Sequence, residues 1–251
     1  MTSNDPVATS PEGLAAEILR ELQRLANPDN VAGMARYGIN REGTLGVPVP
    51  AQRALAADVK RRLKHVPDGP RIRHSTAQRL WDSGIHEARM TAGFLDDPAL
   101  VTREQIESWA ADFDSWDVCD QVTFNLFDRT AHAWPIAAEF TARDETFVKR
   151  CGFVFMAGLA VHQKDVEHDE ALAAFLRLIE REASDERNFV KKAVNWALRQ
   201  IGKRSHALSA AAVATAERIF DEQNDSAAAR WVARDAIREL TDEKTRSRIK
   251  R

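Results

Sequence analysis

The chain has 251 residues, of which 44% are hydrophobic and 29% charged, a composition typical of a folded protein and not of a disordered one. Its formal net charge of -2 excludes a protein that binds polyanions through overall charge, so any nucleic-acid surface must come from local segregation of charge. No run approaches the roughly 18 apolar residues of a membrane span, and two cysteines cannot form a disulfide framework.

The first residues and the two thiols bear on location. Residues 1–7 are polar and include an acid, without the basic start and apolar stretch of a secretory signal. Cys119 and Cys151 lie in no paired motif, and free thiols suit a reducing compartment. We therefore expect a soluble cytoplasmic protein.

Helix-forming residues dominate from residue 10 onward. Ala, Leu, Arg and Glu are abundant, and strand-like alternation of β-branched residues is nearly absent. Ser10, Pro11 and Glu12 form a helix-start signal, a capping residue followed by proline in the first turn. The glycines and prolines of 38–50 mark a loop. Helices are predicted over about 12–27, 50–65, 73–82, 85–95, 102–112, 116–132, 145–160, 168–183, 187–202, 209–223 and 226–240.

Residues 115–121 contain the first candidate for chemistry. Trp116 and Asp120 are four residues apart, so a helix that starts here carries both on one face. Asp120 lies deeper in that helix, where a carboxylate needs either a cationic partner, such as Arg89 or Arg150, or a positively charged substrate. The residues alone leave both interpretations open.

A repeat with a period of 42 residues runs through the second half of the chain. The block Phe147–Arg150 recurs as Phe189–Lys192 and as Trp231–Arg234, and an acid precedes each block. Such a period is typical of HEAT-type repeats, whose two-helix units stack because none buries its apolar face alone. We therefore predict an all-α fold, a right-handed superhelical solenoid of HEAT-like helix pairs, as a single domain over 1–251 with a disordered tail at 1–10.

Weaker copies of the block lie upstream, and one equivalent position is then occupied by four cations and one acid: Arg89, Asp120, Arg150, Lys192 and Arg234. Equivalent positions of a solenoid line up along one surface, so the pattern predicts a basic stripe with one carboxylate set in it. The alternative is a ladder of structural salt bridges between neighbouring helices, and the repeat pattern leaves it open.

Residues 187–204 form the strongest positive segment, and no Asp or Glu occurs from 187 to 216. Four side chains at i, i+4, i+7 and i+11 share one helix face: Lys192, Trp196, Arg199 and Lys203. A basic face that includes an aromatic suits a phosphate backbone with a sugar or base packed on the ring. The alternative is a solvated outer face with Trp196 in the core.

The sequence predicts neither a metal nor a cofactor. His162 and His168, with Asp165 and Asp169 beside them, are typical of a polar loop between helices. No glycine-rich phosphate loop, GxSxG elbow or HExxH motif occurs, and the cysteines lack metal-ligand spacing.

An ordered set of local motifs resembles one known family. In chain order the motifs are Met34–Ile39, Leu45–Pro50, Leu80–Trp81, His86–Arg89, Trp116–Asp120, Phe147–Arg150 and Val190–Arg199. Each is short, but together they resemble the AlkD-like DNA alkylation-repair family between residues 31 and 205.

The resemblance implies a C-shaped stack of HEAT-like repeats with duplex DNA on a basic concave face. It also implies monofunctional hydrolysis of the N-glycosidic bond of N3- and N7-alkylated purines, a step of base-excision repair. By match of motif, Asp120 takes the place of the catalytic aspartate, and Trp116 and Trp196 those of aromatic residues beside the lesion. Arg150 takes the place of an arginine that contacts the DNA backbone, and Tyr37 that of a further aromatic wall.

The residues agree with this chemistry. An alkylated purine is a cationic leaving group that needs no general acid, so one carboxylate can stabilise the oxocarbenium-like sugar and guide water to C1′. Lys192, Arg199 and Lys203 would hold the duplex. Two other functions stay open, a HEAT scaffold that binds DNA without cutting it and a protein–protein scaffold. We expect a monomer without cofactor, metal or membrane partner.

Overall fold

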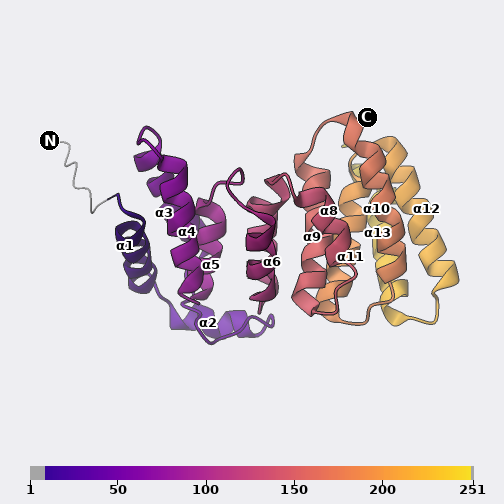
Figure 1. Ribbon diagram of the computed structural model, residues 1–251. Coiled ribbons are helices and arrows are strands. Elements are labelled where there is room, and N and C mark those ends of the chain that lie inside the picture. The colour runs from indigo at the N-terminus through magenta and orange to yellow at the C-terminus, as the bar shows by residue number, and fades with distance from the viewer. Residues whose placement is uncertain (1–8, 250–251) are drawn as a thin grey trace. The chain divides into compact units, whose positions relative to one another are not determined.

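The computed structural model describes residues 9–249, and every regular element within that range is helical (Figure 1). The prediction of an all-α fold is thus confirmed for the described residues. The superhelical sense and the single domain over 1–251 stay predictions, and the tail expected at 1–10 lies almost wholly outside the described range. None of the described helices combines the length and apolarity needed to cross a membrane.

The chain divides into two compact units, which we call the N-terminal unit (to Thr130) and the C-terminal unit (from Ala131). The N-terminal unit contains α1 (Pro11–Arg24), α2 (Pro28–Ala35), α3 (Val49–Leu63), α4 (Gly69–Asp82), α5 (His86–Leu95), α6 (Arg103–Ala111), α7 (Trp116–Asn125) and the 3₁₀ helix η1 (Phe127–Arg129). The C-terminal unit contains α8 (Ala133–Phe140), α9 (Thr146–His162), the 3₁₀ helix η2 (Val166–His168), α10 (Asp169–Glu182), α11 (Asn188–Gly202), α12 (His206–Glu222), α13 (Ala227–Thr241) and α14 (Glu243–Arg246).

Two short helices differ from the sequence prediction. Helix α2 begins after Asn27, whose side-chain oxygen accepts the backbone N–H of Asp29 at 3.0 Å. The helix predicted over 116–132 ends at Asn125, because Leu126 leaves helical geometry (φ -129°, ψ -61°), and α8 follows as a separate element. Helices of eight residues carry too few turns for an apolar periodicity to reveal them.

Helix α5 lies at the centre of the N-terminal unit, since α3, α4 and α7 all pack against it. Beside it, Trp81 and Trp109 stack face to face with ring centroids 4.0 Å apart. The ring of Phe113 lies 6.0 Å from that of Trp81, and the ring of Phe127 lies 6.0 Å from that of Trp109. Polar side chains on α5 are therefore drawn into the interior, and several of them shape the site described below.

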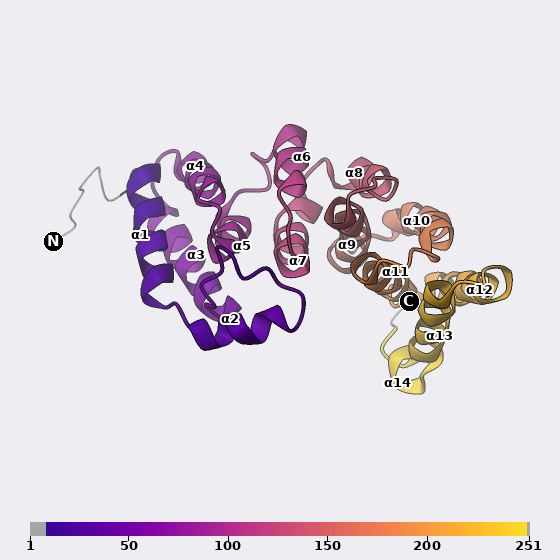
Figure 2. The same cartoon turned by 90° about the horizontal axis from the view of Figure 1, so that it is seen from below.

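The C-terminal unit realises the predicted repeat. Its helices succeed one another as the pairs α8–α9, α10–α11 and α12–α13 (Figure 2), and the second helices α9, α11 and α13 pack side by side. Val148, Val190 and Val232, which are equivalent in the 42-residue repeat, are all buried. The same apolar position is thus buried in each repeat, as stacked repeats require.

Candidate active site

Helix α7 presents an indole and a carboxylate one turn apart, as the spacing predicted. Ser115 precedes the helix in extended geometry, is buried, and donates its hydroxyl to the carboxylate of Asp117 at 2.8 Å. Trp116 and Asp120 follow on the helix, and both side chains are half-buried. The start of α7 is therefore fixed, and it holds both groups at the surface of the N-terminal unit.

A loop from the beginning of the chain joins this helix. The indole N–H of Trp116 donates to the backbone carbonyl of Tyr37 at 3.0 Å. The ring of Tyr37 itself is 71% exposed. Both residues line a pocket of about 480 Å³, whose other walls include Met90 and Gln121. We call it the Tyr37–Trp116 pocket. The structure thus brings two predicted aromatic residues together.

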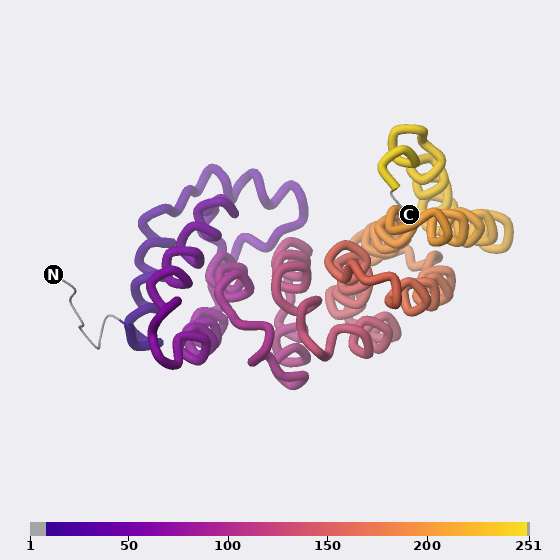
Figure 3. Tube along the Cα trace, turned by 90° about the horizontal axis from the view of Figure 1, so that it is seen from above, coloured from indigo at the N-terminus to yellow at the C-terminus, as the bar shows by residue number. Residues whose placement is uncertain are grey.

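A buried carboxylate holds the loop that walls this pocket, which follows α2 and is traced in Figure 3. Glu87 on α5 is fully buried. Its two oxygens accept the backbone N–H groups of Leu45, Gly46 and Val47 at 2.8, 2.6 and 3.2 Å. Three amide donors satisfy a carboxylate that could not otherwise be buried at acceptable cost. Glu87 therefore fixes the position of the loop.

The loop also depends on one glycine. Gly46 has a φ of +78°, and a Cβ there would lie 2.2 Å from the carbonyl oxygen of Asn27. Its own carbonyl accepts the side-chain amide of Asn30 at 2.8 Å, and buried Gln52 donates to the carbonyl of Val47 at 2.7 Å. In the sequence, Glu87 and Gly46 stand out only as members of the motifs His86–Arg89 and Leu45–Pro50. An acid on an apolar helix face opposite a glycine-rich loop was the signal that could have revealed their contact.

A buried ion pair connects α5 to α7 directly behind the pocket. His86 Nε2 lies 2.9 Å from Asp117 Oδ2, and the histidine is almost wholly buried. Burial opposes the charged imidazole, but the hydrogen bond and charge of Asp117 outweigh it and raise the pKa of His86. Burial would likewise raise the pKa of Asp117, but the hydrogen bond from His86 holds it below its ordinary value. The two shifts both favour the charged forms, and the pair ties the two helices together.

Arg89, a member of the predicted basic stripe, contacts Trp81 on α4 and Asp112, which follows α6. It donates to the carbonyl of Asp112 at 3.1 Å and its guanidinium sits 5.2 Å from the centre of the Trp81 ring. The indole of Trp81 also donates to the Asp112 carboxylate, at 2.8 Å. Arg89 thus helps to close the tryptophan cluster of the core.

The remaining predicted site residues belong to the C-terminal unit. Arg150 on α9 is 5% exposed and donates to the backbone carbonyl of Phe189, at the start of α11, at 2.5 Å. Lys192 on α11 is exposed, and Trp196, one turn further, is half-buried. Arg150 therefore lies in the seam between α9 and α11, and Lys192 is open to solvent.

Acids of α13 face the positive end of α11. Arg199 forms an ion pair with Glu239, and Lys203 lies 2.7 Å from the same carboxylate. Asp235 lies 3.6 Å from Arg199 Nε. Burial would raise the pKa of Glu239, but these two cations hold it below its ordinary value. Salt bridges between neighbouring repeats are therefore present at this end of the segment, although the segment itself contains no acid.

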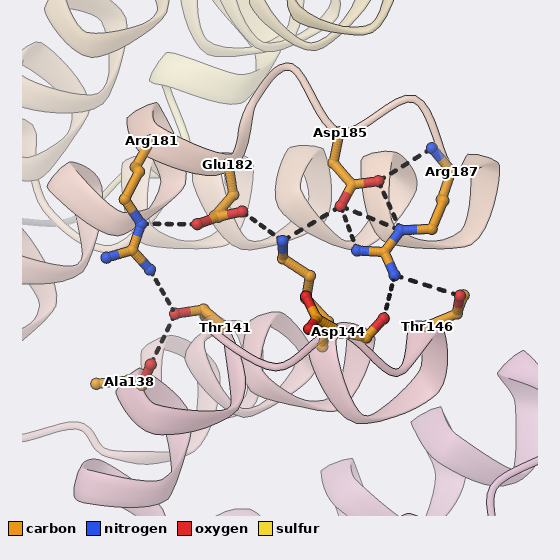
Figure 4. A network of polar contacts seen from close by, with 9 residues as sticks. Ala138, Thr141, Asp144, Thr146, Arg181, Glu182, Asp185 and Arg187 are labelled. Carbon is orange, nitrogen blue, oxygen red and sulfur yellow. Dashed lines mark hydrogen bonds and ion pairs between the residues drawn. The ribbon is translucent and has the colours of Figure 1, made fainter.

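A second ladder joins α9 to the segment before α11 (Figure 4). Lys149 lies 2.5 Å from Glu182 and 3.3 Å from Asp185. Arg187 pairs with Asp185 at 2.6 Å and donates to the carbonyl of Asp144 at 2.5 Å. Asp185, one of the acids that precede the repeated blocks, thus joins one repeat to the next through its carboxylate, whereas Asp144 accepts through its backbone carbonyl.

One group of side chains in the described residues has the composition of a metal site. Asp165, Glu167 and His168 place ligand atoms within 4.8 Å of one another at η2, where both acids are exposed. Arg204 donates to the carbonyl of Asp165 at 2.8 Å and to the carboxylate of Asp169 at 3.1 Å. The loop is therefore fastened by an arginine, and the expectation that the protein uses no metal stays a prediction.

One family model matches most of this chain, and one solved structure resembles its fold. The model of a family described as "DNA alkylation repair enzyme" matches residues 18–240. A solved structure described as "a new family of proteins related to the HEAT-like repeat DNA glycosylases with affinity for branched DNA structures" superposes with a TM-score of 0.69 at 19% identity, over 80% of this chain and 81% of that one. This likeness concerns the fold. No match was found among curated proteins.

Proposed function

Because this chain belongs to the DNA alkylation repair enzyme family, we propose that it is a DNA glycosylase that hydrolyses the N-glycosidic bond of N3- and N7-alkylated purines in duplex DNA. One observation carries the proposal. Trp116 and Asp120 lie one turn apart on α7, and the indole of Trp116 is fixed by the carbonyl of Tyr37 beside a pocket of about 480 Å³. An aromatic wall and a carboxylate are therefore available at one surface.

The proposed chemistry needs little more than these groups. An alkylated purine is already positively charged, so it leaves without protonation, and the sugar acquires oxocarbenium character. The carboxylate of Asp120 would stabilise that charge and orient the attacking water. The face of Trp116 would attract the cation, a contact that contributes about 0.5–2 kcal/mol. The family resemblance assigns the same role to Trp196 on α11. Water is the only co-reactant, so the reaction requires no cofactor.

Contacts to DNA are proposed for five residues. Exposed Lys192 and exposed Tyr37 could meet DNA as they stand. Arg199 and Lys203 would exchange part of their bonding to Glu239 for a phosphate. Buried Arg150 would exchange part of its present bonding for a phosphate.

A second candidate is a protein that binds DNA and does not release bases. Two observations favour this candidate. The structural relative is described as having affinity for branched DNA, and Glu239 already engages Arg199 and Lys203. Both candidates predict DNA binding that weakens with salt. Only the glycosylase requires the carboxylate at position 120.

The deciding experiment measures release of 3-methyladenine and 7-methylguanine from methylated duplex DNA. We expect release by the wild type and a rate about 10²–10³-fold lower for Asp120→Asn, with DNA affinity unchanged. Asp221→Asn, which removes one exposed acid of α12, is the matched control and should retain the wild-type rate. Salt-dependent binding without any release by the wild type would support the second candidate, and equal release by wild type and Asp120→Asn would remove Asp120 from the mechanism.

A further inference from the structure

A second concavity of the N-terminal unit gathers positive charge. It has a volume of about 240 Å³, and its lining contains three cations, no carboxylate, and the side chains of Phe94 and Asn125: the cations are Arg53, Lys60 and Arg129. We call it the basic cleft. Arg53 and Lys60 come from α3, and Arg129 from η1. Segments remote in the sequence thus build one electropositive hollow.

The packing of α3 explains its shape. Arg53 and Lys60 are seven residues apart, so they project from one face of α3 two turns from each other. Two alanines, Ala56 and Ala57, line the cleft between them and leave it open. The guanidinium of Arg53 lies 4.2 Å from the centre of the Phe94 ring, which orients its N–H groups.

The cations of the cleft are poorly compensated. Burial lowers the pKa of Arg53, and the charge of Arg129 lowers it further. Burial also lowers the pKa of Lys60, and Arg73 and Arg129 add to the effect, whereas Asp97 and Asp96 oppose it. The three charges therefore repel one another, and an anion in the cleft would relieve that repulsion.

The nearest acids are engaged elsewhere or neutral. Asp97 pairs with Arg73 at 2.5 Å, and Asp96 lies 2.9 Å from His74. Asp128 stands beside Arg129, with 3.9 Å between Oδ1 and Nε, but burial raises the pKa of this carboxyl to about 8. At neutral pH it adds little negative charge to the cleft.

One residue connects the cleft to the candidate active site. Gln121 lines the Tyr37–Trp116 pocket, and its side-chain oxygen accepts a hydrogen bond from Arg53 at 3.0 Å. Asn125, in the lining of the cleft, donates to the carbonyl of Gln121 at 2.7 Å. Along α7, the five residues from Asp120 to Asn125 rise about 7–8 Å. This is about twice the 3.4 Å advance per nucleotide of one DNA strand.

We propose that the basic cleft binds a backbone phosphate of the DNA, about two nucleotides from the nucleotide that faces Asp120. The proposal rests on the proposed function for the identity of the ligand. A hollow of this size with three cations suits a phosphate group, and is small for a base or a peptide. Fixing a phosphate at this distance would set the register of the strand at Asp120, because phosphate contacts determine position and orientation.

The test neutralises the cleft in the full-length protein. The variant Arg53→Gln/Lys60→Gln/Arg129→Gln is compared with a control that loses the same charge from exposed positions of the same unit, Arg20→Gln/Lys64→Gln/Arg71→Gln. Affinity for an unmodified fluorescent duplex is measured between 50 and 200 mM salt. We expect the cleft variant to bind about 10–100-fold more weakly than the control, with a log–log salt slope shallower by about one to two.

Two results would overturn the proposal directly. Equal affinity and slope for the two triple variants, or no duplex binding by the wild type, would overturn the proposal. Should the triple variant fail to fold, Lys60→Gln and Arg129→Gln are measured singly, and each must weaken binding several-fold. Pyrophosphate is the second probe. If it binds the wild type and not the cleft variant while duplex affinity is unchanged, the cleft takes a free phosphate compound and the DNA assignment is wrong.

Base release separates this proposal from the proposed function. A wild type that releases no base but loses duplex affinity through the cleft variant would contradict the glycosylase and support the cleft. A wild type that releases base with a KM that the cleft variant does not change would support the glycosylase and contradict the cleft.

Discussion

The two units use positive charge in different ways. In the C-terminal unit, Arg199 of α11 and Lys203, which follows that helix, share the carboxylate of Glu239, supplied by the next repeat. In the N-terminal unit, Arg53 and Arg129 border a hollow whose lining contains no carboxylate. The first cluster is conspicuous in the sequence and is neutralised in the fold. The second is scattered in the sequence and is concentrated by the fold.

The difference follows from how each unit is built. Repeats place equivalent positions in contact, so a cation in one repeat readily meets an acid of the next, as Lys149 meets Glu182 and Arg218 meets Glu180 at 2.8 Å. The surface of the N-terminal unit is assembled from a loop and helices without such equivalence. An acid-free stretch of sequence is therefore a poor guide to an acid-free surface, and ligand binding is better sought where the fold leaves like charges together.

The largest expected effect on stability comes from releasing the loop at residues 45–47, which Glu87 holds in the N-terminal unit. Glu87→Ala would leave two buried amide N–H groups and one part-buried one without their acceptor, and it would open a cavity beside α5. We expect a loss of about 2–4 kcal/mol in the free energy of unfolding, measured by urea denaturation, together with loss of base release.

Two variants control that measurement. Glu87→Gln keeps the size of the side chain and one acceptor oxygen, so it should cost less than Glu87→Ala. Glu217→Ala, on an exposed face of α12 in the C-terminal unit, should change stability by no more than about 0.5 kcal/mol. A Glu87→Ala protein as stable as Glu217→Ala would mean that the loop does not depend on this carboxylate.

A smaller effect is expected from pH, and it should be confined to the N-terminal unit. The raised pKa of His86 means that its contribution to stability is complete below the ordinary histidine value and is lost as pH rises through the raised value. Asp128 acts in the same direction, because its folded form retains a proton up to about pH 8 that the unfolded chain has lost. The lowered pKa of Glu239 affects stability only at acid pH.

Hydrogen exchange read by mass spectrometry resolves the two units and checks this prediction. Between pH 6 and pH 9, after correction for intrinsic exchange rates, protection should fall in α5 and α7 and stay constant in α11 and α13. His86→Gln should cost about 1–3 kcal/mol at pH 6 and reduce the pH dependence. An equal loss of protection in both units would contradict the assignment to His86 and Asp128.

The sequence carried the features that repeat or that lie close together along the chain. The 42-residue period of valines, the helix pairs and the turn between Trp116 and Asp120 all depend on local spacing, and the structure contains them. Helices α2 and α8 were missed because eight residues give little periodicity. The roles of the eight predicted site residues stay predictions.

Contacts between segments that are far apart in the chain could not be predicted from the sequence. The amides of 45–47 reach Glu87, Tyr37 reaches Trp116, and Arg53 reaches the hollow that Arg129 completes. None of these contacts has a spacing rule, because each depends on how α3, α5 and α7 pack. The same applies to Glu239, which neutralises α11 from the following repeat.

The smallest expected effect tests that neutralisation directly. Glu239→Gln removes the carboxylate shared by Arg199 and Lys203 without changing its shape, so both cations become available to a phosphate. We expect duplex affinity at 50 mM salt to rise about two- to fivefold, with a log–log salt slope steeper by up to about one, because each further phosphate contact releases a counterion. Fluorescence anisotropy across a salt series measures both quantities, and Glu217→Gln, which removes an exposed acid of the same unit, is the control for net charge. An affinity equal to that of the control would mean that Arg199 and Lys203 are structural and that the positive charge of α11 does not meet DNA.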